Sequence, residues 1–305
     1  MNVNDISIKE VDLHIHSKYS GDGYLTVKEI IMLLHEKKIK VAAIADHDSI
    51  DGLQEAQAVS KQYDIKLINA IELSTIYNDK IVHLLGYDFQ LEENAISKVI
   101  EKLSLRRIEN IKKVIEKLKA LGICVDRSRL EKFTENRAPM VSSYAQVAIE
   151  DSVNSGSKVL KPYMQGGSKS INGSINFALD YMVPGKSAYV EEALISLEEG
   201  IEIITESKGI PVLAHPGQWF EEKDKSILKK LISKGLKGIE VYTPYHSDNQ
   251  IKYFEQLAKE YKLVITCGSD FHGKKMKPLN ELGRLIKADM YMVNKLLECK
   301  NKKIN

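Results

Sequence analysis

VDLHIH (residues 11–16) is a short segment with an apolar residue at every second position, and it predicts a β-strand. A capping box formed by Thr26 and Glu29 follows it, and predicts that a helix begins there and runs to Lys38. The same alternation then continues with a strand VAAIAD (41–46), a helix over 49–63, and the strands LINAIEL (67–73) and IVHLLGYDF (81–89). Strands that alternate with helices favour parallel pairing and an α/β fold.

The pattern changes near residue 91. Apolar residues recur at helical spacing from Ile96 to Leu118 and stop at Gly122, and polar, loop-like segments follow. We therefore expect residues 91–190 to form a mostly helical insertion. The α/β alternation returns with a helix over 191–207, strands PVLAH (211–215) and GIEVY (238–242), a helix over 249–261 and the strand LVITCGSDFH (263–272). About seven strands, in residues 1–90 and 191–305, would then form one barrel-like sheet.

The composition excludes several classes of protein. The 305 residues are 43% hydrophobic, which is enough for a core, and the net charge of +2 provides no strong basic field for nucleic acid or membrane. No apolar run is long enough to span a bilayer, and the first residues lack the features of a signal peptide. Three widely spaced cysteines fit no disulfide framework. We expect a cytoplasmic protein with no membrane association and no obligate protein partner.

Histidines gather in or directly after the predicted strands, accompanied by carboxylates. His14 and His16 are two residues apart on one strand, so their side chains share a face. The carboxyl ends of strands in a parallel barrel meet on one face, which would bring distant residues into one pocket. A lone histidine on a strand is usually an ordinary core or surface residue, but burying so many titratable groups without a cation would be very costly. The candidate metal ligands are His14, His16, Asp22, His47, Glu72, His83, His215, Asp270 and His272.

The size of this set indicates how many ions it binds. Nine protein ligands exceed what one or two open catalytic ions need, so three divalent ions with about three ligands each fit better. Imidazole and carboxylate together suit Zn²⁺, Mn²⁺ or Fe²⁺ and are poor for Ca²⁺. The residues do not choose among those three metals.

The motifs carrying these residues resemble the PHP (polymerase and histidinol phosphatase) superfamily of metal-dependent phosphoesterases. They occur in order along nearly the whole chain: DLHIHSKYSGDG, IADHDSIDGLQEA, INAIELS, HLLGYDF, VLAHPGQ, GIEVY and TCGSDFHG. The resemblance implies a distorted (β/α)₇ barrel with a helical insertion that helps to recognise the substrate. It also implies removal of the 3′-phosphate from a nucleoside 3′,5′-bisphosphate, or trimming of short RNA from its 5′ end.

The resemblance further implies three ion positions. The first would use His14, His16, Glu72 and Asp270, the second Glu72, His83 and His215, and the third Asp22, His47 and His272. Four of these residues, Glu72, Asp270, His272 and His215, would form the catalytic core. Two positions depart from the family pattern. HSKYSGDG is one residue longer than the usual HSxxSDG, which shifts Asp22, and Met140 stands where relatives tend to have a histidine.

Other residues are candidates for supporting roles. Arg107, Arg137, Lys186 and His246 could bind substrate phosphates, although Arg107 could equally belong to a solvated helix face and Lys186 to a solvated loop. His246 could instead orient a neighbour. Asp12, Asp46 and Asp48 could orient the ligand histidines, with helix capping as the alternative for Asp48.

Three functions remain open at this point. The first is a phosphoesterase acting on a small phosphorylated nucleotide, with a nucleoside 3′,5′-bisphosphate as the best guess. The second is a 5′–3′ exonuclease on short RNA, against which the small net charge is weak evidence. The third is a catalytically silent metal-binding module, which should have lost ligands, whereas all nine positions can be filled here.

Overall fold

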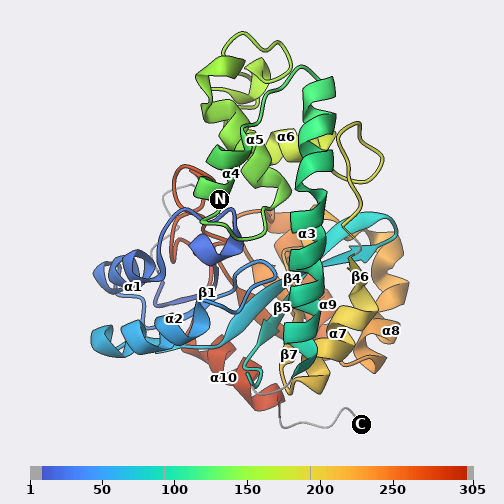
Figure 1. Ribbon diagram of the computed structural model, residues 1–305. Coiled ribbons are helices and arrows are strands. Elements are labelled where there is room, and N and C mark those ends of the chain that lie inside the picture. The colour runs from blue at the N-terminus through green and yellow to red at the C-terminus, as the bar shows by residue number, and fades with distance from the viewer. Residues whose placement is uncertain (1–8, 92–93, 193, 301–305) are drawn as a thin grey trace.

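The computed structural model describes residues 9–91, 94–192 and 194–300 (Figure 1). Its strands form two sheets. In the first, three strands lie in the order β1 (Val11–Ile15), β2 (Val41–Ile44) and β3 (Lys66–Leu67), and all pairs are parallel. The second has the order β6 (Ile195–Ser196), β4 (Ala70–Tyr77), β5 (Lys80–Tyr87), β7 (Ile210–Leu213), β8 (Gly238–Tyr242) and β9 (Val264–Cys267).

The two sheets join into a distorted barrel. One junction is a parallel bridge between Ile15, at the end of β1, and Phe271, just beyond β9. The other is a parallel bridge between His47, beyond β2, and Glu72 of β4. The expected barrel is thus confirmed, although the described residues contain nine short strands rather than about seven. Both junctions lie among the candidate metal ligands, so closing the barrel also assembles the site.

The expectation of parallel pairing is wrong for one strand. β5 pairs antiparallel with β4 on one side and with β7 on the other. The cause is the short turn between β4 and β5, where Asn78 and Asp79 both have positive φ angles, of 48° and 58°. Two residues in this conformation make a hairpin turn, whereas a parallel connection needs room for a crossover.

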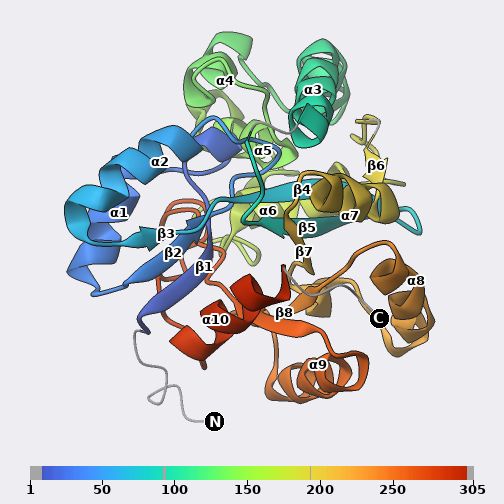
Figure 2. The same cartoon turned by 90° about the horizontal axis from the view of Figure 1, so that it is seen from below.

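Helices surround the strands, as Figure 2 shows from below. They are α1 (Val27–Glu36), α2 (Leu53–Ser60), α7 (Leu197–Glu206), α8 (Leu228–Ser233), α9 (Asp248–Tyr261) and α10 (Met290–Cys299). The capping box at Thr26 and Glu29 is present as predicted. The helix expected from residue 191 begins later, because Ser196 and Glu199 form a second capping box. α10 was not predicted.

Residues between β5 and β6 form the predicted mostly helical segment, at the top of Figure 1. It contains α3 (Asn94–Ala120), α4 (Arg127–Phe133), α5 (Val141–Glu150) and α6 (Gly173–Tyr181). A separate cluster of buried apolar residues, which includes Leu118, Leu130 and Phe177, lies within it. The start of α3 packs on the barrel instead, since Ile96 belongs to the barrel core. In the described part of the chain, no helix combines the length and apolar character of a membrane span.

Candidate metal centre

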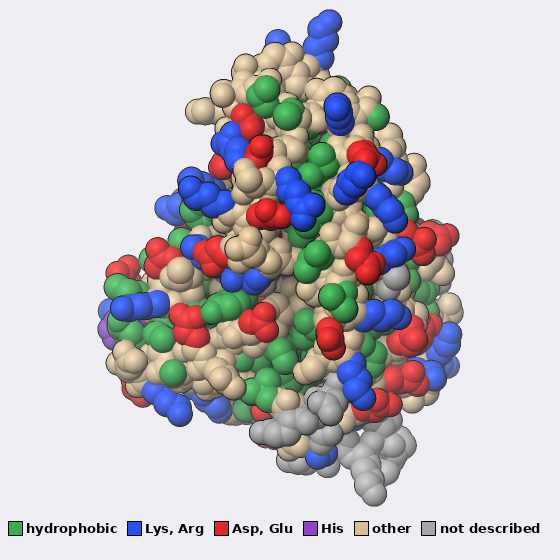
Figure 3. Space-filling model, viewed as in Figure 1, with side chains coloured by type: hydrophobic (Ala, Val, Ile, Leu, Met, Phe, Trp, Pro, Cys, Tyr) green, Lys and Arg blue, Asp and Glu red, His purple; other side chains and the backbone are tan. Residues whose placement is uncertain are grey.

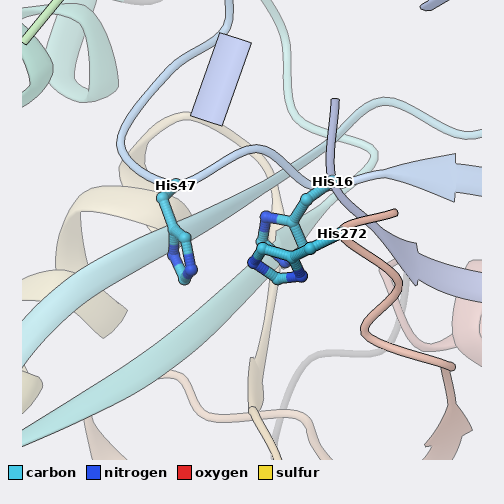
Figure 4. A group of neighbouring side chains, drawn as sticks. All are labelled: His16, His47 and His272. Atoms are coloured by element: carbon cyan, nitrogen blue, oxygen red, sulfur yellow. The ribbon is translucent and has the colours of Figure 1, made fainter. Parts of the chain in front are cut away.

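Three of the predicted ligands converge from separate segments of the barrel. His16 follows β1, His47 follows β2 and His272 lies beyond β9, and their rings face one another (Figure 4). The ring centroids of His16 and His272 are 3.9 Å apart, and those of His16 and His47 are 4.4 Å apart. All three side chains are buried. The carboxyl ends of strands β1, β2 and β9 therefore meet at one site, as the sequence predicts.

Glu72 lies at the centre of this site and is completely buried. Its Oε2 atom is 3.2 Å from Nε2 of both His14 and His16. Its two oxygens together lie between 3.0 and 3.2 Å from ring nitrogens of five histidines, namely His14, His16, His47, His83 and His215. Glu72 thus contacts ligand candidates from β1, β2, β5 and β7, consistent with a bridging carboxylate.

Two aspartates complete the predicted set. Asp270 Oδ1 is 3.5 Å from His14 Nε2 and 3.1 Å from His16 Nε2. Asp22 Oδ1 is 3.6 Å from His272 Nε2, so the lengthened loop still brings Asp22 to the centre. The structure therefore brings all nine predicted residues together.

The unsatisfied atoms of the centre fit divalent cations. The following ligand atoms are buried without a hydrogen-bond partner: Nε2 of His14, His16 and His272, Nδ1 of His47, Oδ1 of Asp22 and Asp270, and Oε2 of Glu72. Leaving so many buried polar atoms unpaired is costly, whereas an ion coordinated by them would remove the cost. The donors are imidazole nitrogens and carboxylate oxygens, which suit first-row transition metals.

Ligand atoms lie within coordinating range of one another in three overlapping groups. One group, His14, His16, Glu72 and Asp270, is the first predicted ion position. The other groups are His47, Glu72 and His83, and His16, His47 and His272. Each shares two members with a predicted position. His215 and Asp22, which the other two positions would also use, still contact Glu72 and His272 respectively.

Burial and neighbouring charges shift the pKa values of the centre in opposite directions. Burial alone would lower the pKa of His14, but the charges of Glu72, Glu240 and Asp270 raise it well above its usual 6.5. For His47 and His272, burial prevails and holds the pKa well below that value. Burial favours the neutral form of Glu72, yet the histidines around it lower its pKa. Burial and neighbouring charges therefore act in opposite directions on adjacent groups of the cluster.

One orienting residue is Glu240 of β8, which the sequence analysis did not single out. Its Oε1 atom lies 2.9 Å from Nδ1 of His14, and its Oε2 atom accepts a hydrogen bond from the backbone N–H of His215. This contact leaves His14 Nε2 facing Glu72 and Asp270, as a metal ligand requires. A glutamate within the apolar strand GIEVY was the available signal.

The predicted orienting aspartates behave differently from one another. Asp46 acts on His16 through Ser20, because Ser20 Oγ is 2.7 Å from His16 Nδ1 and donates to Asp46 at 3.1 Å. Asp12 instead accepts hydrogen bonds from backbone N–H groups of Ser269 and Gly283. Asp48 accepts from the backbone of Ser74 and so contacts no ligand imidazole. Of the three, only Asp46 reaches the imidazole of a candidate ligand histidine, and it does so through the Ser20 hydroxyl, whereas Asp12 accepts the backbone N–H of His14.

Asp270 is held by Tyr245, which follows β8, and by residues of the segment after β9, and sequence reasoning missed these contacts. Its Oδ2 atom forms a buried ion pair with Lys277 and accepts a hydrogen bond of 2.5 Å from the hydroxyl of Tyr245. Asn280 donates to the backbone oxygens of Ser269 and Asp270. Oδ1 of Asp270 is left to face His14 and His16. Single polar residues without a spacing pattern gave no signal for this arrangement.

Arg107, a predicted phosphate ligand, is buried between two carboxylates. Its guanidinium lies 2.8 Å from Asp48 and 2.7 Å from Glu192. It thereby joins helix α3 to the loop after His47. His246, also predicted to bind phosphate, accepts the backbone N–H of Gly217 at Nε2 and has Nδ1 2.8 Å from the carbonyl of Val241. Both ring nitrogens of His246 thus contact backbone groups of the protein. Burial lowers the pKa of His246.

The two other predicted phosphate ligands lie on the helical segment. Arg137 donates to the carbonyl of Lys18 at 2.8 Å and to Glu135, and its guanidinium lies 4.8 Å from the ring centre of Tyr19. Lys186 is exposed on a loop near Asp180. Arg137 is therefore beside the loop that carries Asp22, whereas Lys186 contacts none of the nine central residues by any recorded hydrogen bond or ion pair.

Comparison with known proteins agrees with this geometry. The PHP domain model matches residues 12–243. A 3′,5′-nucleoside bisphosphate phosphatase of Chromobacterium violaceum is 28% identical over 268 residues, covering 86% of this chain and 87% of the relative. A 5′–3′ exoribonuclease of Haemophilus influenzae is 27% identical over 270 residues, covering 87% and 90%. A phosphoribosyl 1,2-cyclic phosphate 1,2-diphosphodiesterase of Eggerthella lenta is 26% identical over 265 residues, covering 86% and 94%.

Solved structures share the fold. A Chromobacterium violaceum protein described as an amidohydrolase, with bound sulfate and no metal, has a TM-score of 0.79 and 24% identity, covering 96% of this chain and 97% of its own. A Bifidobacterium adolescentis protein described as a metal-dependent phosphoesterase has a TM-score of 0.78 and 22% identity, with the same coverage.

The chain belongs to the PHP domain family, because the family model matches about three quarters of its length. It is a phosphoesterase, a hydrolase that acts on phosphoric ester bonds. Its cluster of histidine, glutamate and aspartate side chains can bind metal ions. Two of the nine central residues, Asp270 and His272, lie beyond the matched residues and join the site through the bridge between Ile15 and Phe271.

Proposed function

We propose that the chain hydrolyses a phosphate monoester of a small nucleotide, with a nucleoside 3′,5′-bisphosphate as the favoured substrate. The observation that carries this proposal is the convergence of nine potential ligands, Glu72 among them, of which all but His83 are buried. Similarity to a 3′,5′-nucleoside bisphosphate phosphatase along most of both chains supports the choice of substrate. The low cysteine count favours action in the cytoplasm.

Three divalent ions, of Mn, Fe or Zn, are the proposed cofactors. The three overlapping groups of ligand atoms and their donor types support this number and these metals. Bound ions of this kind lower the pKa of coordinated water and neutralise phosphate oxygens. The protein would hold them through His14, His16, Asp22, His47, Glu72, His83, His215, Asp270 and His272.

The side chains of the chain would contribute positions and protonation states. Glu72, Asp270, His272 and His215 would form the catalytic core, with Glu72 shared between two ion positions. Glu240 would keep Nδ1 of His14 engaged, so that Nε2 can serve as a ligand. Lys277 and Tyr245 would occupy Oδ2 of Asp270, so that only Oδ1 is offered to an ion. Preorganisation of this kind avoids rearrangement during the reaction.

An extended RNA substrate is a second candidate, supported by similarity to the exoribonuclease of Haemophilus influenzae. Binding of a long strand depends on a track of positive charge. On the face in Figure 3, Lys and Arg side chains are interspersed with Asp and Glu, and the net charge of the chain is only +2. These observations favour the small nucleotide.

The test is a comparison of two substrates with Mn²⁺-loaded protein. We expect phosphate release from adenosine 3′,5′-bisphosphate, and little release of mononucleotides from a 5′-phosphorylated oligoribonucleotide. E72Q should abolish the release, whereas E116Q, on the exposed face of α3, should leave it unchanged. Mononucleotide release alone would favour the exoribonuclease, and no reaction with either substrate would overturn the proposal.

A further inference from the structure

Residues 135–143 of the helical segment contact the loop formed by residues 18–22, which we call the Asp22 loop. Lys18 Nζ lies 2.6 Å from Glu135, and the carbonyl of Lys18 accepts a hydrogen bond from Arg137. The ring of Tyr19 lies under the guanidinium of Arg137. These contacts join two parts of the chain that are about 120 residues apart. They arise from packing in three dimensions, so the spacing of residues in the sequence does not reveal them.

Further contacts with the helical segment extend along the rest of the Asp22 loop. Ser143 donates a hydrogen bond of 2.8 Å to the carbonyl of Gly21. The backbone at Gly21, with a φ of 79°, comes so close to the helical segment that a Cβ atom there would lie 3.0 Å from the carbonyl of Ala138. Ser142 donates a hydrogen bond of 3.0 Å to Oδ2 of Asp22 itself. The helical segment therefore contacts the candidate ligand directly.

The Asp22 loop is also hydrogen-bonded to residues of the candidate metal centre. Ser20 is 2.7 Å from Nδ1 of His16, accepts the backbone N–H of His47 and donates to Asp46. Asp22 is 5% exposed, and its Oδ1 atom has no hydrogen-bond partner and faces His272. The Oδ2 atom of Asp22 is thus hydrogen-bonded to the helical segment, whereas its Oδ1 atom faces the candidate metal centre.

We infer that Ser142 is a positioning residue for one metal ion, and that the helical segment controls occupancy of that ion through the Asp22 loop. The inference rests on the proposed metal-dependent function and extends it. By holding Oδ2, the Ser142 hydroxyl turns Oδ1 of Asp22 toward His272, where the two side chains can share an ion. Without it, Asp22 can rotate or exchange its partner for water, and the ion position loses a fixed ligand.

This arrangement couples the two sites in both directions. A ligand that shifts the helical segment would change how firmly the ion near Asp22 is held, and filling that position would in turn steady residues 135–143. Such coupling is reciprocal by thermodynamic necessity. Changes at Ser142 should affect the ions near Glu72 less. Ser142 is hydrogen-bonded to Asp22, which is not among the candidate ligands of those ions.

The test uses metal-free full-length protein titrated with Mn²⁺ alone. S142A should raise the dissociation constant of one ion about 10–100-fold, or remove one ion per chain, while the remaining ions bind as in the unchanged protein. S142T, which keeps the hydroxyl, should restore binding. S155A, at an exposed serine of the same helical segment, should match the unchanged protein. Thermal unfolding of the metal-free variants checks that each one folds.

Hydrogen exchange provides a second readout. Adding Mn²⁺ should slow amide exchange in residues 17–24 and 137–145 together in the unchanged protein, and should slow only the first segment in S142A. Equal ion numbers and equal dissociation constants in S142A and S155A would overturn the inference. So would a chain that binds no ion near Asp22, even if phosphate release from nucleotides is observed. If the unchanged protein binds its ions but releases no phosphate from nucleotides, the result would contradict the proposed function and not this inference.

Discussion

Glu240 and His14 are 226 positions apart in the sequence, and Oε1 of Glu240 lies 2.9 Å from Nδ1 of His14. Both side chains are completely buried. The other oxygen of Glu240 accepts the backbone N–H of His215, at 2.8 Å. One carboxylate on β8 therefore contacts an imidazole on β1 and the backbone of His215, two residues beyond β7, and so links two predicted ligands.

Replacing this carboxylate should weaken metal binding. E240Q keeps the size of the side chain but removes the charge that supports the Nδ1–H of His14, so we expect the affinity for Mn²⁺ to fall about 10–100-fold. Titration of metal-free protein measures the change, with the exposed E116Q as the matched control. An unchanged dissociation constant in E240Q would show that Glu240 does not orient a ligand.

Lys277 should matter most when no metal is bound. K277M removes the cation paired with the buried carboxylate of Asp270, which should lower the free energy of unfolding of the metal-free protein by about 3–5 kcal/mol. Added Mn²⁺ should recover part of that loss, because an ion would again neutralise Asp270. Urea unfolding measures both effects. K275M, at an exposed lysine two residues earlier, is the control, and equal stability of the two variants would refute the prediction.

Arg106 and Arg107 are adjacent, but their replacement should lower the free energy of unfolding by very different amounts. Arg107 is buried between Asp48 and Glu192, so R107M should lower the free energy of unfolding by about 3–5 kcal/mol. The Arg106 side chain is 39% exposed and lies 3.7 Å from the exposed Glu109, so R106M should cost less than about 0.5 kcal/mol. Urea unfolding and KM are measured together. A stable R107M with a greatly raised KM would instead support the phosphate contact that the sequence suggested.

Metal binding should release protons and strengthen as the pH rises. The charges of Glu72, Glu240 and Asp270 outweigh burial and raise the pKa of His14, which favours its protonated form, and a ligand nitrogen must lose its proton. The same shift stabilises the metal-free fold fully below pH 6.5, and this contribution disappears as the pH rises through the folded-state pKa. Calorimetric titration with Mn²⁺ in buffers of different ionisation enthalpy counts the protons. A pH-independent affinity without proton release would contradict this assignment.

Much of the fold and the site could be predicted because the signals were local or repeated. Thr26 and Glu29 form a capping box within four residues, and the structure contains it. The candidate ligand histidines lie in or shortly after strands, and parallel strands bring their carboxyl ends together regardless of sequence separation. Asp22 was the least regular member, yet it too lies at the centre.

The remaining features depend on contacts that leave no pattern in one sequence. The direction of β5 was set by the turn at Asn78 and Asp79, whose positive φ angles were not anticipated. Glu240 is a single charge in an apolar strand, and Lys277 is one of several lysines after β9. The roles of these residues arise from burial beside particular partners, and only the three-dimensional packing determines those partners.

The most direct test of the metal-dependent centre is phosphate release from adenosine 3′,5′-bisphosphate as metal-free protein is titrated with Mn²⁺. We predict no release without metal, a rate that rises with bound Mn²⁺ and saturates when the centre is filled, and loss of the reaction on adding a chelator. Release that proceeds equally well without metal, or no release from any nucleotide when the ions are bound, would contradict the account.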